Sequence, residues 1–201
     1  MELPSSHSST TQSTNVNLDS FHVVISGSNG YNKDAAPGPQ GGFAGPVELG
    51  GAINAPNDPV TGTNTYMGYK FFSFSQVQTF ANGVSACTAA CTSQTAYNSR
   101  HPPAAPKKPN VCNQVVVYVL SDENQPQGIY CAMYSEQWDR FYATNYGQYR
   151  GSDFWSVSQA YAYTNATYAA NYGPICATGG CPSNSYRGGN CGGWGANSTG
   201  C

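Results

Sequence analysis

Charged side chains are scarce in this chain. Lysine and arginine together number 8 and aspartate and glutamate 10, so charged residues make up 9% of the 201 residues, against about 25% in an average soluble protein. A protein that binds nucleic acid or an anionic lipid surface needs a cluster of basic residues. The sequence shows no basic footprint of that kind, and we therefore expect neither nucleic acid nor a membrane as a partner.

Long apolar runs and histidines are also few. No run approaches the roughly 20 apolar residues of a membrane-spanning helix. The N-terminal residues lack the basic and apolar regions of a signal peptide, and we expect any secretion signal to have been removed. The three histidines, His7, His22 and His101, lie in separate segments, and the cysteines lack the C-x2-C spacing of zinc sites. We therefore expect no metal and no cofactor.

Cysteines are the most informative residues that are present. Their number, 8, is even and indicates an oxidising compartment, so we expect a secreted, extracellular protein. Cys87 and Cys91 lie one turn apart on one face of a predicted helix. Cys112 and Cys131 lie beside or within β-like segments, so the helix can be joined twice to a sheet. The glycosylation sequons at Asn165 and Asn197 fit a glycoprotein.

The pattern along the chain predicts an α+β fold with long Gly/Pro-rich loops. Ser85 is the expected N-cap of a helix over 86–97 that ends near Arg100, because two prolines follow His101. Strands are expected at 66–74, 115–120, 129–134 and 157–164, with a turn over 125–128. The chain divides into a polar arm (1–19), a short strand with a Gly/Pro-rich loop and a further strand at 46–53 (20–61), a central domain (62–165) and a Cys/Gly-rich tail packed on that domain (166–201).

The central cysteines, the aromatic segment Tyr69–Phe72 and the sequence Gly128–Tyr134 resemble a PAN/apple domain, and more narrowly the PAN-like modules of secreted fungal proteins. The resemblance covers roughly residues 62–165. It implies a single helix crossing a twisted antiparallel sheet, with Cys87 bonded to Cys131 and Cys91 to Cys112. It also implies non-catalytic recognition of carbohydrate or of a protein surface.

The tail is expected to hold itself by cross-links, because its apolar residues are too few to bury much surface. Its four cysteines are predicted to form two local bridges, with the pairing left open: Cys176, Cys181, Cys191 and Cys201.

Aromatic side chains between residues 138 and 155 are the best candidates for a binding surface. Flat rings suit sugar faces, and neighbouring amides and carboxylates can supply hydrogen bonds. The alternative is that these rings close the core, as buried aromatics often do in small domains. The predicted binding residues are Trp138, Tyr142, Tyr146, Tyr149, Asp153 and Trp155.

Three functions compete at this stage. The favoured one is a secreted recognition module for a glycan or an extracellular protein. The second is a structural, self-associating protein, because low charge and abundant Gly, Tyr, Asn and Gln suit the stacking of sheet edges. The third is a glycan-active enzyme that would use two of the carboxylates Glu136, Asp139 and Asp153, although acids beside Arg140 and Arg150 more often form ion pairs.

Overall fold

The computed structural model describes residues 36–58, 61–123 and 125–176. The polar arm, the strand expected near residue 21, Asn197 and the cysteines at 181, 191 and 201 lie outside these residues. No helix in the described part of the chain is long and apolar enough to cross a membrane.

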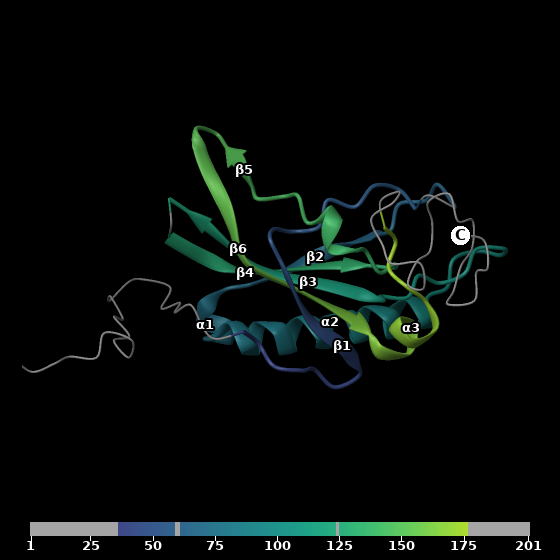
Figure 1. The fold of residues 1–201 in the computed structure, drawn as a ribbon. Coiled ribbons are helices and arrows are strands. Elements are labelled where there is room, and N and C mark those ends of the chain that lie inside the picture. Colours follow the sequence, from purple (N-terminus) through teal and green to yellow (C-terminus); the bar gives the residue numbers. More distant parts are fainter. Residues whose placement is uncertain (1–35, 59–60, 124, 177–201) are drawn as a thin grey trace, which may run out of the picture.

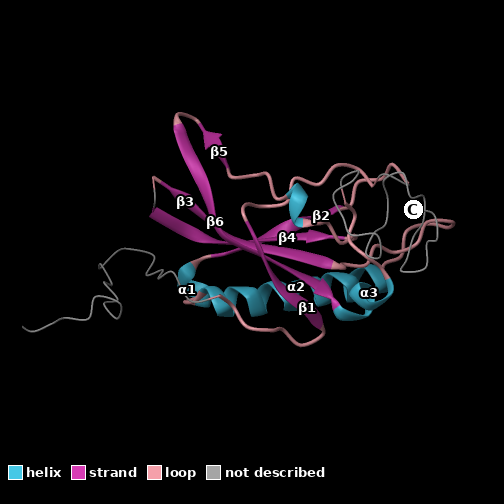
Figure 2. Ribbon diagram, in the orientation of Figure 1, coloured by secondary structure: helices cyan, strands magenta, loops and turns pink. Residues whose placement is uncertain are grey.

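A six-stranded antiparallel sheet with a long helix on one face forms the centre of the fold (Figures 1 and 2). The path of the sheet is β1-β6-β3-β4-β2, and β5 pairs with β6 beside this path. The strands are β1 (Phe43–Leu49), β2 (Tyr66–Phe72), β3 (Gln114–Asp122), β4 (Gln125–Tyr134), β5 (Gly147–Arg150) and β6 (Asp153–Asn165). The helices are α1 (Phe74–Val77), α2 (Phe80–Arg100), α3 (Ala166–Asn171) and the 3₁₀ turn η2 (Arg140–Tyr142). The α+β class is therefore observed, with more helices than the single one expected.

Helix α2 begins earlier than the sequence predicts. Thr79 is the N-cap, and its side chain accepts a hydrogen bond from the Asn82 backbone N–H at 3.1 Å. Ser85, the expected cap, lies inside the helix, so that prediction is wrong. Gly83, which suggests a break, instead lets the helix approach β4, because a Cβ there would collide with the Ile129 side chain. The predicted end at Arg100 is confirmed.

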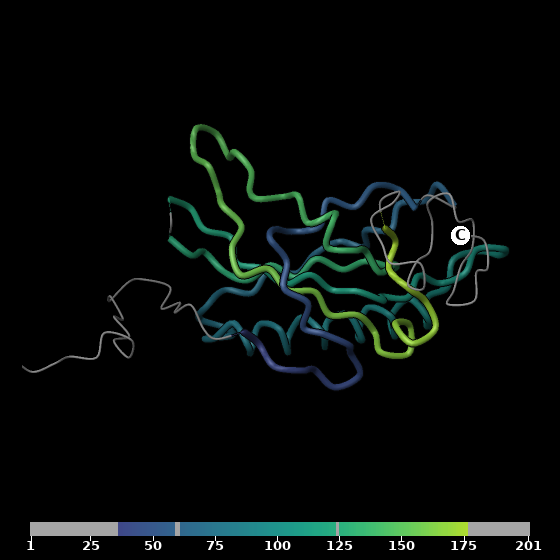
Figure 3. The backbone as a smooth tube through the Cα atoms, in the orientation of Figure 1, coloured from purple at the N-terminus to yellow at the C-terminus, as the bar shows by residue number. Residues whose placement is uncertain are grey.

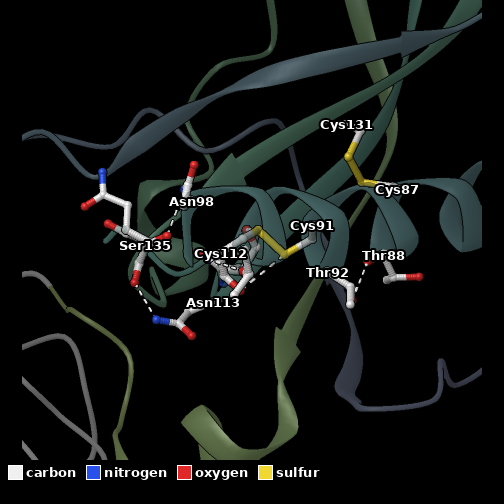
Figure 4. Close-up of a disulfide and its surroundings, with 12 residues drawn as sticks. Cys87, Thr88, Cys91, Thr92, Asn98, Cys112, Asn113, Cys131 and Ser135 are labelled. Atoms are coloured by element: carbon white, nitrogen blue, oxygen red, sulfur yellow. Dashed lines mark hydrogen bonds between the residues drawn. A yellow bond between two sulfur atoms is a disulfide. The ribbon is translucent and has the colours of Figure 1, made fainter. Parts of the chain in front are cut away.

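Two disulfides join α2 to the sheet (Figure 4). Cys87 is bonded to Cys131 in β4, and Cys91 to Cys112 just ahead of β3, each with a Cα–Cα distance of 5.4 Å. These are the two pairs that the PAN/apple resemblance implies. They lie in a core between helix and sheet that includes Phe80, Val84, Val117, Ile129 and Tyr163.

The β3–β4 hairpin determines which side chains face α2. Val117 pairs with Cys131 and Tyr118 with Tyr130, so the first pair faces the helix and the second faces the opposite side. The predicted turn over 125–128 is wrong, because Gln125 is already paired with Asp122 and belongs to β4. The predicted strand over 115–120 is confirmed within β3 and is buried on both faces.

Segments on either side of 62–165 add to the same structure. β1 pairs with β6, so the Gly/Pro-rich segment contributes an edge strand to the sheet. In the tail, the Ile175 N–H donates to the Gln137 carbonyl at 2.7 Å, and the side chain of Ile175 is buried. Cys176 is also disulfide-bonded, and its partner lies outside the described residues.

Candidate functional site

The face of the sheet opposite α2 is covered only in part. A second core of aliphatic and aromatic side chains fills one end, beneath the segments that follow β1 and β4. Figure 3 traces both segments on the side away from α2. At the other end, the β5–β6 hairpin rises from the sheet (Figures 1 and 2). An open groove of about 460 Å³ remains between these parts.

Strands β2, β3 and β4 form the floor of this groove, and two loops form its walls. One wall contains Ile53, Asn54, Ala55 and Asn64, and the other contains Asn145, Gly147, Gln148 and Arg150. The lining includes no aspartate or glutamate, and Arg150 is its only charged residue. The floor and edge are rich in tyrosine: Tyr66, Tyr69, Tyr118, Tyr130 and Tyr134.

Cross-strand pairing places the aromatic rings in contact. Tyr130 in β4 is paired with Tyr118 in β3 and with Phe71 in β2. Its ring stacks on Tyr118 at 5.7 Å and 14°, and on Tyr69 at 5.7 Å and 28°. Tyr69 is 58% exposed at the sheet edge. The groove therefore offers a pre-formed row of contacting aromatic rings that ends in solvent at Tyr69.

Two tyrosine hydroxyls of the floor, those of Tyr118 and Tyr134, have raised pKa values. Burial, and then the neighbouring tyrosines, raise the pKa of Tyr118 to about 12. Burial also raises the pKa of Tyr134 well above its ordinary value, and its hydroxyl donates to the Ile53 carbonyl at 3.0 Å. That bond fastens one wall to the floor, whereas the Tyr118 hydroxyl bonds no other described residue.

Arg150 is held on the opposite wall by three contacts. Its guanidinium carbon lies 4.1 Å from the centre of the Trp155 ring. With the Gln148 amide oxygen turned toward it, that oxygen accepts from Nε at 2.8 Å and from Nη2 at 3.0 Å. Nη2 also donates to the Tyr130 hydroxyl at 3.4 Å. The cation is thus oriented by neutral groups.

Trp138, the first predicted binding residue, belongs to the core. It is 2% exposed, and its indole N–H donates to the Thr65 hydroxyl at 2.9 Å. The Gln114 amide accepts from its backbone N–H at 2.9 Å and donates to its carbonyl at 3.1 Å. Tyr142 packs edge-on against Trp138 at 4.8 Å. The prediction of Trp138 as a surface ligand is therefore wrong, because a residue distant in sequence anchors it inside.

The other four predicted residues lie in or beside the β5–β6 hairpin. Tyr146 and Tyr149 are 61% and 74% exposed, and Tyr149 contacts Phe154 at 5.1 Å. The Trp155 ring packs against the Arg150 guanidinium. Asp153 accepts a hydrogen bond from the Ser152 hydroxyl at 2.8 Å. None of the six predicted residues lines the groove, although the same segment supplies its Asn145–Arg150 wall.

The three candidate catalytic carboxylates have local contacts instead. Asp139 caps η2 by accepting from the Phe141 N–H at 2.9 Å, Glu136 accepts from the Tyr168 hydroxyl, and Asp153 lies at the turn of the β5–β6 hairpin. None lines the groove. Within residues 36–58, 61–123 and 125–176, no three His, Cys, Asp or Glu side chains gather to hold a metal ion.

Asn165, in the first sequon, is the N-cap of α3. Its side-chain oxygen accepts from the Tyr168 N–H at 3.1 Å. The amide nitrogen, to which a glycan would be attached, is not used in this cap.

Sequence reasoning missed the tyrosines of β2, β3 and β4. The available signal was alternation: if Cys131 faces the helix, then Tyr130, Ala132 and Tyr134 face the other way. Tyr118 interrupts an otherwise aliphatic strand in the same manner.

Comparison with known proteins adds no relative: the sequence matches no family model, and neither a curated protein nor a solved structure matches it.

Proposed function

We propose that this protein is a secreted, non-catalytic recognition module that binds carbohydrate in the tyrosine-lined groove. The observation that carries the proposal is the groove itself, a floor of contacting tyrosine rings between walls that carry side-chain amides and one arginine. The proposal also draws on the resemblance to PAN/apple domains, which implies recognition without catalysis. The paired disulfides fit an oxidising, extracellular setting.

The chemistry of the groove matches that of a sugar. A pyranose has apolar C–H faces that pack on aromatic rings, and hydroxyls around its rim that need hydrogen-bond partners. Tyrosine supplies both a ring and a polar hydroxyl, and Asn54, Asn145 and Gln148 place amides beside the floor. Ligand sites commonly combine an aromatic lining with a few such polar groups.

The groove is open, so a single contact is expected to be weak. Aromatic contacts add about 0.5–1.5 kcal/mol beyond the surface that they bury. Useful retention on a cell wall or matrix would then come from repeated binding to a polymer, where linked sites raise the apparent affinity.

The test compares two tyrosines of similar exposure. Tyr69 lines the groove and is 58% exposed, whereas Tyr97 lies on α2, outside the groove lining, and is 53% exposed. After a glycan-array screen, Tyr69→Ala should weaken binding of the retained oligosaccharide about tenfold in calorimetry, and Tyr97→Ala should leave it unchanged. Equal affinity for both variants, with the fold intact, would remove the groove from consideration.

Self-association is the second candidate, and the edge strand β2 favours it. Its exposed side chains include Tyr66, Tyr69 and Phe71, with Lys70 as its only charged residue. The other edge, β1, is interrupted by Pro46 and a register shift, which discourage pairing. Concentration-dependent association in sedimentation, lost in Tyr69→Lys, would support this function. A monomer at every concentration would exclude it.

A further inference from the structure

We infer that the groove takes a glycan with an anionic substituent, a carboxylate or a sulfate, and that Arg150 binds that group. This inference rests on the proposed carbohydrate-binding function and narrows it to acidic sugars. It starts from an imbalance: the lining carries one positive charge and no negative one.

The charge of Arg150 has no carboxylate partner among the described residues. Asp153 is opposite Arg150 in the β5–β6 register, but its carboxylate accepts from the Ser152 hydroxyl and makes no ion pair with the arginine within the described chain. The groups that do hold the guanidinium are an amide oxygen, a phenol and an indole ring. None of these neutralises it.

The contacts of Arg150 also leave donors for a ligand. Nε and Nη2 are used by Gln148 and Tyr130, whereas Nη1 and its two hydrogens bond no described residue. Because the side chain is already stacked on Trp155, little conformational freedom remains to be lost on binding. Hydrogen bonds from a guanidinium to a carboxylate or sulfate are charge-assisted and stronger than those to a neutral hydroxyl.

The surrounding floor favours the same ligand. The Tyr118 hydroxyl stays protonated at neutral pH, so it is a neutral donor rather than a repelling phenolate. An acidic sugar stacked on the tyrosines would thus meet donors from the floor and the wall and no like charge from the lining.

A second basic site must be separated from this one. A cavity of about 590 Å³ near the C-terminal end of α2 is lined in part by His101, Lys107 and Lys108. These side chains are exposed, and the lining of this cavity includes no tyrosine, phenylalanine or tryptophan, so they would attract any polyanion without regard to its sugar. The double variant Lys107→Gln/Lys108→Gln controls for that attraction.

The experiment uses the full chain and two matched pairs of probes: oligogalacturonate with its methyl ester, and dextran sulfate with dextran. We expect wild-type protein to bind at least one acidic probe about tenfold more tightly than its neutral counterpart. Arg150→Gln should reduce that ratio to about one. Arg140→Gln, which changes an exposed arginine outside the groove, and the double lysine variant should preserve the ratio.

The outcomes separate the two proposals. The acidic probe that is preferred identifies the substituent as carboxylate or sulfate. If Tyr69→Ala weakens binding but neutral and acidic probes bind alike, or if the acidic preference survives Arg150→Gln, the carbohydrate function stands and the role of Arg150 is refuted. If no probe binds, or if Tyr69→Ala binds every probe as wild type does, both proposals fail.

Discussion

Removal of the Cys91–Cys112 disulfide by a double alanine substitution should destabilise the protein mainly through its denatured state. The bond closes a loop with a sequence separation of 21, which corresponds to about 3.3 kcal/mol of loop-closure entropy at room temperature. Both cysteines are almost fully buried, so the loss of their sulfur atoms from the core adds to this figure.

The Cys87–Cys131 bond spans a separation of 44 and encloses the first loop. Alone it would be worth about 4 kcal/mol. Because the two loops are nested, the inner bond shortens the outer one to roughly 25 residues and reduces its contribution to about 3.5 kcal/mol. By the same reasoning the Cys91–Cys112 bond contributes about 2.8 kcal/mol while the outer bond is intact. The two double alanine variants should therefore be destabilised by amounts within about 1 kcal/mol of each other despite their different loop lengths.

Urea unfolding distinguishes this entropic account from simple packing loss. Opening a cross-linked loop lets the denatured chain expose more surface, so the dependence of unfolding free energy on urea should steepen. Loss of sulfur atoms from the core alone would lower the midpoint with the slope unchanged. A destabilisation below about 1 kcal/mol, or a larger one with an unchanged slope, would refute the reasoning.

Three further predictions concern the core and the groove. Gln114→Leu leaves the buried backbone N–H and C=O of Trp138 without the amide that bonds both. It should lower the free energy of unfolding, measured in urea, by about 2–4 kcal/mol. The control Gln127→Leu, at a partly exposed position, should lower it by less than about 0.5 kcal/mol. Gly83→Val should cost about 1–3 kcal/mol in the same measurement, because its side chain collides with Ile129; wild-type stability would contradict the close contact. Burial raises the pKa of Tyr118 to about 12, so as the pH rises this hydroxyl ionises in the unfolded chain before it ionises in the folded one. The contribution of Tyr118 to the free energy of unfolding is therefore complete below pH 10 and is lost between pH 10 and about 12. Tyr118→Phe should reduce that alkaline loss, and an identical pH profile would contradict it.

The parts of the fold that the sequence predicts are those with a local signal. The helix carrying Cys87 and Cys91 follows from Ala-rich composition and ends where prolines begin. β3 follows from the apolar run Val115–Leu120, which has no polar alternation and therefore indicates burial on both faces. In each case the neighbouring residues alone favour the observed structure.

The start of α2 and the strand β1 depend on tertiary contacts and were therefore misplaced. Gly83 is a poor helix former, but its lack of a side chain lets α2 pack closely on Ile129. We expect this strand at 46–53, whereas β1 spans Phe43–Leu49, because its bounds are set by pairing with β6, and Pro46 is tolerated at this edge where the register shifts. Neither contact is visible in a local window of sequence.

The aromatic residues show the same division between local and distant causes. Trp138 lies in a segment without regular periodicity and so resembles an exposed loop residue, but Gln114, 24 positions earlier, bonds its backbone on both sides. Solvent exposure of an aromatic ring in a loop depends on such distant partners. It could not be assigned from the density of aromatics in the segment.

The disulfide and the groove are two consequences of one strand register. In β4, Cys131 points toward α2, so the residues on either side of it, Tyr130 and Ala132, point into the groove. A shift of one residue would move Cys131 away from Cys87 and turn Tyr130 into the core at the same time. The Cys87–Cys131 bond therefore selects the register that places the tyrosine floor on the open face. The cysteine spacing thus carried information about the binding surface as well as the fold, once the alternation of β4 was taken into account.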